Sequence, residues 1–215
     1  MKNMAKMEIS ATQPGSRQVQ KSEEMRKRIC DATLKCLADV GYERVSTKLI
    51  SETGGMSRGA VNYHYPTRND LLVAAYAHLL NSWEDQWPFT EVDQVRALDP
   101  GVLIDALWQG LFAQETYHAI LELMLAARKD EELSTRLRKT LGPWAESRDI
   151  RTAALLGADL GSDAVLNLLQ LNLCILRGIT VNRFFDGTAL TERSLVAMWK
   201  EMFVAKLANL NTRTD

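Results

Sequence analysis

Four side chains suited to hydrogen bonding with nucleic acid lie within seven consecutive residues, namely Arg58, Asn62, Tyr63 and His64. A guanidinium group offers two parallel N–H donors that match guanine, and an amide group matches the edge of adenine. Phenol and imidazole groups suit phosphate oxygens, which position a protein on a duplex without reading its sequence. These residue types at this spacing predict contact with DNA.

Such side chains need a short helix that a second helix braces, and the neighbouring sequence predicts both. Ser46 is placed to cap a helix over 47–53, and Gly54-Gly55 supplies a tight turn. Ser57 then precedes a short helix that ends at Pro66. Two short helices joined by a glycine-containing turn form a helix-turn-helix unit, whose second helix enters the major groove.

Helical periodicity continues on both sides of this unit. Apolar residues recur at helical spacing from Ser22 to Val40, and Gly41 ends that helix. After the unit we expect a long helix from Thr67 to just before Pro88. Further helices are expected at about 100–114, 116–128, 131–157, 162–185 and 191–209, with 131–157 interrupted or kinked at Gly142-Pro143.

Charge divides the chain unevenly. The whole chain has a net charge of −1, yet residues 1–70 contain 12 Lys and Arg against 8 Asp and Glu. The remaining residues contain 14 Lys and Arg against 19 Asp and Glu. A basic first third on an acidic body indicates that this end of the molecule meets a polyanion, although a solvated surface would give the same count.

The segment from Asp31 to Leu72 resembles the TetR family, the tetracycline-repressor-like regulators. The matching features are a first helix ending in Gly-Tyr, a Ser-Thr pair opening the second, the run GMSRGAVNYHY, and the opening of the fourth helix. The resemblance implies contacts with base edges for Arg58, Asn62 and Lys48, and contacts with phosphates for Thr47, Tyr63, His64 and Arg68. The family often has tyrosine in place of Asn62, so the operator sequence cannot be transferred from a relative.

The last two expected helices are apolar over most of their surface. Residues 162–185 are apolar almost all the way round, and the final helix has a broad apolar face. Such helices are buried on more than one side, which predicts a two-fold dimer closed by a four-helix seam. The predicted interface residues are Leu195, Met198, Trp199, Met202 and Phe203. A homodimer would present two reading helices to a palindromic operator in double-stranded DNA.

Aromatic residues concentrate between residues 83 and 144, which predicts a mostly apolar ligand cavity. Its expected lining residues are Trp83, Trp87, Trp108, Phe112, Tyr117, Leu121, Met124, Trp144 and Asn172. For any single one of them, ordinary core packing is the first interpretation. Together they favour a small apolar or aromatic effector, which releases a repressor from its operator by shifting a conformational population.

The sequence therefore predicts an all-α protein of about nine helices. Residues 1–21 form a disordered arm, 22–68 a three-helix helix-turn-helix DNA-binding domain, and 69–215 a larger helical ligand-sensing and dimerisation domain. No metal site is expected, because the histidines and cysteines lack ligand spacing. No cofactor and no enzyme motif are expected either. With no expected membrane span or signal peptide, the predicted location is the cytoplasm. An activator, a ligand-independent regulator and a helical adaptor that does not bind DNA remain alternatives.

Overall fold

The computed structural model describes residues 14–91, 97–159, 161–186 and 188–212. Within these ranges the secondary structure is helical, without strands. The α-helices are α1 (Pro14–Val40), α2 (Thr47–Gly54), α3 (Arg58–His64), α4 (Arg68–Glu84), α5 (Pro100–Leu107), α6 (Thr116–Ala127), α7 (Glu131–Leu156), α8 (Asp163–Asp186) and α9 (Ala189–Asn211). Three short segments complete the order, namely η1 (Tyr42–Arg44), η2 (Phe89–Glu91) and η3 (Trp108–Phe112), the last a π-helical turn. The predicted all-α class and the number of helices are confirmed.

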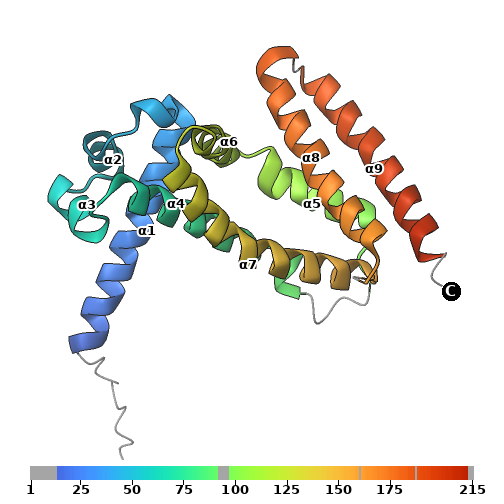
Figure 1. Cartoon of the computed structure of the whole chain (residues 1–215), viewed down its shortest axis with the longest axis horizontal. Helices are drawn as coiled ribbons and strands as arrows, with labels where there is room; N and C mark the ends of the chain where they lie inside the picture. Colours follow the sequence, from blue (N-terminus) through green and yellow to red (C-terminus); the bar gives the residue numbers. More distant parts are fainter. Residues whose placement is uncertain (1–13, 92–96, 160, 187, 213–215) are drawn as a thin grey trace, which may run out of the picture.

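The helices form two groups that α4 connects. Helices α1, α2 and α3 lie at one end of the molecule, and the α8–α9 hairpin lies at the other (Figure 1). Between them, α4 packs against both α1 and α7, and α6 packs against α1 and α7. Buried Ile29, Leu37, Ile50, Val61 and Leu72 form the small core that holds α1 to α4 together.

Polar caps fix where the short helices begin. The Ser46 side chain accepts a hydrogen bond from the Leu49 N–H, and the Ser57 side chain accepts one from the Ala60 N–H. Thr67 and Asp70 form a reciprocal capping box at the start of α4. Each cap satisfies N–H groups that the first turn of a helix leaves unpaired, so these residues set the register of α2, α3 and α4.

Two predicted boundaries in the N-terminal part and the last helix are wrong. Helix α1 begins at Pro14 rather than at Ser22, so residues 14–21 are not a disordered arm; the rest of that predicted arm, 1–13, lies outside the described residues. Residues 17–20 are exposed and gain little from packing. Arginine, glutamine and lysine are good helix formers, and they extend the helix by propensity. Helix α9 begins at Ala189, because Thr188, not Thr191, provides the cap.

Two predicted features of the larger helical group also differ. Helix α7 runs as one element through Pro143, since Leu137 is buried before it and the Trp144 indole donates to the Leu80 carbonyl after it. The expected helix 100–114 is instead split into α5 and the π-helical turn η3.

Helix α8 is apolar enough, by length and composition, to cross a membrane. An 18-residue window within Asp163–Phe185 has a mean hydropathy of 1.6, so the expectation that there is no apolar stretch of membrane-spanning length does not hold by this measure. The many leucine, isoleucine and valine side chains of the helix outweigh the polar residues that interrupt it. Buried Asn172 and Thr180 are hydrogen-bonded inside the protein, and α8 packs along α9. We interpret α8 as a core helix of the bundle.

Candidate nucleic-acid interface and ligand cavity

The backbone of Gly55 and two side chains of α1 hold the turn between α2 and α3 in place. Gly55 has a left-handed backbone with φ of 61°, which favours glycine because it has no Cβ. The Arg28 guanidinium of α1 donates to the carbonyl oxygen of Gly54 at 2.9 Å. The Cys36 thiol donates to the Thr53 hydroxyl at 3.3 Å. The turn therefore sets a defined angle between the two helices.

Helix α3 has one buried side and one exposed side. Val61 is fully buried, and the Tyr65 hydroxyl lies 3.4 Å from the Cys30 sulfur on α1. On the other side Arg58 and Asn62 are exposed, and their spacing of four residues places them on one face of the helix. Tyr63 is 82% exposed. Arg58, Asn62 and Tyr63 are thus brought together on a solvent-facing surface.

Two further candidates lie at the start of α2. Thr47 is half-buried at the first position of the helix, and Lys48 is exposed. The Lys48 ammonium lies 4.0 Å from Glu52 in a solvent-exposed pair. A pair of this kind stabilises little, so it does not hold the Lys48 side chain away from a ligand.

Two candidates have neighbours that sequence reasoning did not identify. The half-buried His64 ring packs edge-on against Tyr63, with centroids 5.1 Å apart. The Arg68 guanidinium lies 4.1 Å from the centroid of the Tyr42 ring and donates to the Tyr42 carbonyl. Arg68 therefore braces η1 against the start of α4, in addition to being exposed at the predicted interface.

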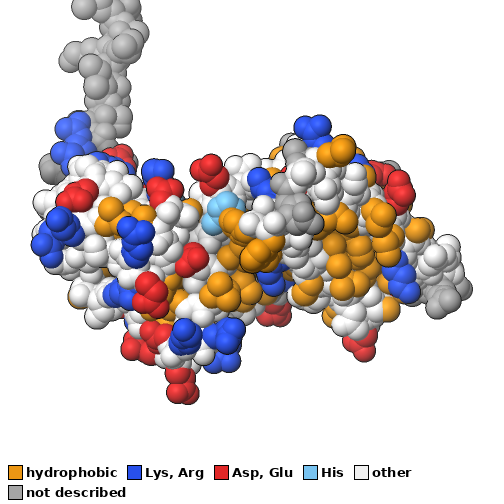
Figure 2. Space-filling view, turned by 90° about the horizontal axis from the view of Figure 1, so that it is seen from above, with side chains coloured by type: hydrophobic (Ala, Val, Ile, Leu, Met, Phe, Trp, Pro, Cys, Tyr) orange, Lys and Arg blue, Asp and Glu red, His pale blue; other side chains and the backbone are white. Residues whose placement is uncertain are grey.

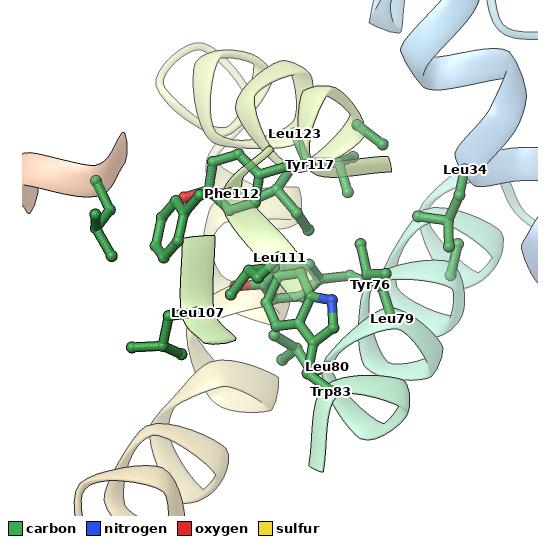
Figure 3. Packing of buried hydrophobic residues seen from close by; sticks show 14 of the residues in the cluster. Leu34, Tyr76, Leu79, Leu80, Trp83, Leu107, Leu111, Phe112, Tyr117 and Leu123 are labelled. Atoms are coloured by element: carbon green, nitrogen blue, oxygen red, sulfur yellow. The ribbon is translucent and has the colours of Figure 1, made fainter. Parts of the chain in front are cut away.

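A cavity of about 290 Å³ lies among α4, α6, α7, α8 and the η3 turn. Its walls include Trp83 stacked against Tyr117, with centroids 6.2 Å apart, and Phe112 at 4.7 Å from Tyr117. Trp83 also meets Trp144 edge-on at 6.0 Å. Figure 3 shows Trp83 and Leu80 of α4 opposite Leu111 and Tyr117. This is a mostly apolar, aromatic chamber beside the second half of α4.

Comparison with known proteins decides the family. The sequence profile of the bacterial regulatory proteins of the tetR family matches residues 29–75, which cover the end of α1 through the first half of α4. An uncharacterized HTH-type transcriptional regulator of Mycobacterium tuberculosis is 30% identical over 144 residues, covering 66% of this chain and 73% of the relative. The chain belongs to the TetR family. It is a transcriptional regulator with a helix-turn-helix DNA-binding domain, and not an enzyme.

Further proteins match most of this chain in sequence or in fold. The HTH-type transcriptional regulator CymR of Pseudomonas putida is 25% identical over 179 residues, covering 79% of this chain and 84% of CymR. GusR of Salmonella enterica is 18% identical with a TM-score of 0.64, covering 86% of this chain and 96% of GusR. FadR of Bacillus subtilis, in complex with stearoyl-CoA, is 14% identical with a TM-score of 0.59, covering 84% of this chain and 96% of FadR.

The cavity of this TetR-family chain contains five of the nine residues predicted to line it. These are Trp83, Phe112, Tyr117, Met124 and Trp144. Burial raises the pKa of the Tyr117 phenol above its ordinary value, although the neighbouring Arg177 lowers it in part. Burial likewise raises the pKa of Tyr76, which also lines the cavity, to about 12. Both phenols are therefore neutral at pH 7.

The other four predicted residues lie outside this cavity. Trp87 is 48% exposed beyond the end of α4, Trp108 is buried in core outside the cavity, and Leu121 packs half-buried against the core. Asn172 is buried, but its side-chain oxygen accepts a hydrogen bond from the Trp199 indole at 2.8 Å. Its polar group is therefore used between α8 and α9. These four residues were predicted from residue type, which does not say which face of each helix turns inward.

Sequence reasoning missed the charged end of the cavity. Glu84, Arg148, Arg151, Gln170 and Arg177 all contribute to its lining. Arg148 and Arg151 are three residues apart, so the helical period places both on one face of α7. That spacing was a usable signal. The approach of α4 and α8 to this face is a tertiary feature that no local pattern encodes.

Two polar contacts join the cavity helices to the DNA-binding helices. A Glu122 carboxylate oxygen on α6 accepts from the Tyr42 N–H of η1 at 2.8 Å. Arg136 on α7 donates to Asp70 on α4 at 2.6 Å. Hydrogen bonds from Thr67, and then from Arg136, lower the pKa of Asp70, so this carboxylate stays ionised at neutral pH.

The outer face of the α8–α9 hairpin is apolar. Met198 and Met202 of α9 are 60% and 57% exposed, and Leu171 of α8 is 48% exposed. Figure 2 shows hydrophobic side chains gathered over this part of the molecule. Trp199 and Phe203, by contrast, are buried within the protomer. Their place in a dimer interface stays a prediction, although little of either side chain is accessible in the single chain.

The remaining predicted interface residue, Leu195, is half-buried beside the exposed methionines. Across the part of the chain that the structure describes, no three His, Cys, Asp or Glu side chains are grouped so that they could hold a metal ion.

Proposed function

We propose that this TetR-family regulator is a homodimeric repressor that binds a palindromic operator and is released by a small apolar or aromatic effector. Helix α4 carries the proposal. It begins at the capping box beside the helix-turn-helix unit, and its last turn contributes Trp83 and Glu84 to the cavity. One rigid element therefore belongs to both the DNA-binding end and the effector chamber.

The proposed DNA contacts follow from the exposed surface of α3 and the start of α2. Arg58 and Asn62 face base edges in the major groove, with Lys48 as a third reader. Phosphate contacts come from Thr47, Tyr63, His64 and Arg68. The burial of Val61 and the partial burial of Tyr65 support this assignment, since they fix which side of α3 is turned outward.

The proposed dimer closes on the outer face of the α8–α9 hairpin. Leu171, Met198 and Met202 are too exposed to be explained by packing within one protomer. Two copies of this hairpin would cover each other in an isologous four-helix seam, which would place two α3 helices on one side of the dimer. We place the protein in the cytoplasm, where its DNA is.

Effector release is proposed as a population shift. A ligand that fits the cavity better in one arrangement of α4 favours that arrangement, and the spacing of the two α3 helices changes with it. Contacts from Glu122 to Tyr42 and from Arg136 to Asp70 support this coupling, because α6 and α7 also line the cavity. In two similar structures of other proteins, EbrR is complexed with imidazole and FadR with stearoyl-CoA.

The test is fluorescence anisotropy of the purified protein on DNA from upstream of its own gene and on a random duplex, at two salt concentrations. The expected result is tight binding to the upstream DNA alone, with a logarithmic salt dependence from phosphate contacts. Equal binding to both duplexes would contradict sequence-specific recognition of that DNA. Absence of binding to either at low salt would refute the DNA-binding proposal altogether.

A further inference from the structure

The charged end of the cavity holds more cationic than anionic groups. Three guanidinium groups line the chamber, those of Arg148, Arg151 and Arg177, and Glu84 is the one carboxylate in the same lining among the described residues. Each of these four side chains is only partly exposed. A cation that faces a confined, mostly apolar chamber loses part of its hydration. An anionic partner compensates for the lost water.

Two of the three arginines have such a partner in the protein. Arg148 donates through two of its nitrogens to one oxygen of Asp149, at 2.9 and 2.6 Å. The other Asp149 oxygen accepts from the Gln170 amide at 2.9 Å. Arg151 lies 3.8 Å from Glu84. The positive charges of Arg148 and Arg151 are therefore matched by two carboxylates.

Arg177 has no such charge partner among the described residues. Its Nε–H donates to the Tyr117 hydroxyl at 3.0 Å, and no described carboxylate lies within the 4.0 Å that defines an ion pair. The Tyr117 phenol is neutral at pH 7, because burial raises its pKa. A guanidinium carries five N–H donors, so most of the donors of Arg177 remain available beside the aromatic walls.

We propose that the effector is an aromatic monocarboxylate whose carboxylate pairs with Arg177 and whose ring lies among Trp83, Phe112 and Tyr117. This rests on the proposed function, in which the cavity is the effector site. One unmatched positive charge calls for one negative charge on the guest. The planar guanidinium fork matches a carboxylate through two parallel hydrogen bonds.

The charge balance of the cavity also favours a carboxylate over other anions. A phosphate monoester carries a charge of about −1.5 to −2 at pH 7, more than the single excess charge of the chamber. Arg148 and Arg151 already have carboxylate partners, so a second negative charge on the guest would have no unmatched cation to pair with. The volume of about 290 Å³ suits a guest of one or two rings.

The experiment compares acids with their ring-matched amides by isothermal titration calorimetry, without DNA. The probes are benzoate, 2-naphthoate and biphenyl-4-carboxylate, each against its carboxamide. The wild-type protein is compared with Arg177→Gln and Arg177→Lys. Arg138→Gln is the control, because Arg138 is an exposed arginine of α7 outside the cavity and its loss changes the net charge equally.

For at least one ring size, the wild type and Arg138→Gln should bind the acid about 10- to 100-fold more tightly than the amide, the range expected for a charge-assisted hydrogen bond. Arg177→Gln should lose this preference and keep its affinity for the amide, which also shows that the variant is folded. Arg177→Lys should retain part of the preference, because it keeps the charge without the fork.

Equal affinity for acid and amide in the wild type would overturn the proposal, as would an unchanged preference in Arg177→Gln. Failure of all three acids to bind would overturn it for this class of guest. The proposed function fails differently, by the absence of operator binding in the anisotropy assay, so the two outcomes are distinguishable.

Discussion

Replacing the two exposed methionines of α9 should convert the proposed dimer into monomers. The double change Met198→Ser and Met202→Ser removes apolar surface from the outer face of the hairpin without touching the inner one. Met198 and Met202 are 60% and 57% exposed in the single chain, so most of each side chain is available for burial between two copies.

The expected magnitude follows from this exposure. Full burial of a methionine side chain contributes about 1.5–3 kcal/mol, so burying the exposed part contributes about 0.9–1.8 kcal/mol. Two methionines in each of two protomers give about 4–7 kcal/mol. At about 1.4 kcal/mol for each factor of ten, the dimer dissociation constant should rise by about three to five orders of magnitude.

Analytical ultracentrifugation across a concentration series measures this constant, and circular dichroism checks that the monomer keeps its helices. Phe203→Ala is the contrasting variant. Because Phe203 is fully buried within the protomer, its truncation should lower the free energy of unfolding by about 3–5 kcal/mol. A double methionine variant that stays dimeric at the concentrations where the wild type does would refute this interface.

The remaining predictions concern DNA reading and stability. Arg58→Ala should weaken binding to operator DNA by about 1–3 kcal/mol and relax one base position, whereas Arg68→Ala should weaken operator and random DNA alike. Anisotropy on both duplexes measures this, and equal losses for Arg58→Ala would remove its role as a reader. Ser57→Ala should cost about 1 kcal/mol, since it removes the cap of α3; urea unfolding measures it, and Ser57→Asp should restore the cap. Burial raises the pKa of Tyr76 from 10 to about 12, so the unfolded chain loses this proton first and stability falls as pH rises from 10 to 12. In urea unfolding, Tyr76→Phe should reduce this loss in the free energy of unfolding by about 2–3 kcal/mol. A pH profile identical to that of the wild type would contradict the prediction.

The DNA-binding end could be predicted from the sequence because its signals are local. Ser46, Ser57 and Thr67 cap the helices that their positions predicted, and the two glycines form the expected turn. The exposed side of α3 follows from the same periodicity, since packing Val61 and the half-buried Tyr65 inward turns Arg58 and Asn62 outward.

The cavity and the dimer face were predicted less well, because they depend on how distant helices meet. Tryptophan content suggested a chamber between residues 83 and 144, yet Trp108 lies in the core and Trp87 faces solvent. The sequence showed that α9 has a broad apolar face. It did not show which residues of that face are buried in the protomer and which are exposed. Trp199 and Phe203 fill the protomer, which leaves Met198 and Met202 outside. The cationic end required α4, α7 and α8 to converge, which only the tertiary structure shows.

Because α4 is one unbroken helix, a small tilt at its cavity end displaces its other end. Its 17 residues, at 1.5 Å each, span about 25 Å between the capping box and the cavity. A tilt of about 5° at the cavity end would displace the other end by about 2 Å, and two protomers tilting in opposite directions would change the separation of their α3 helices by about 4 Å. Successive major grooves on one face of B-DNA are about 34 Å apart. A guest that displaces Trp83 only slightly would therefore move both reading helices out of step with the duplex, without unfolding any part of the protein.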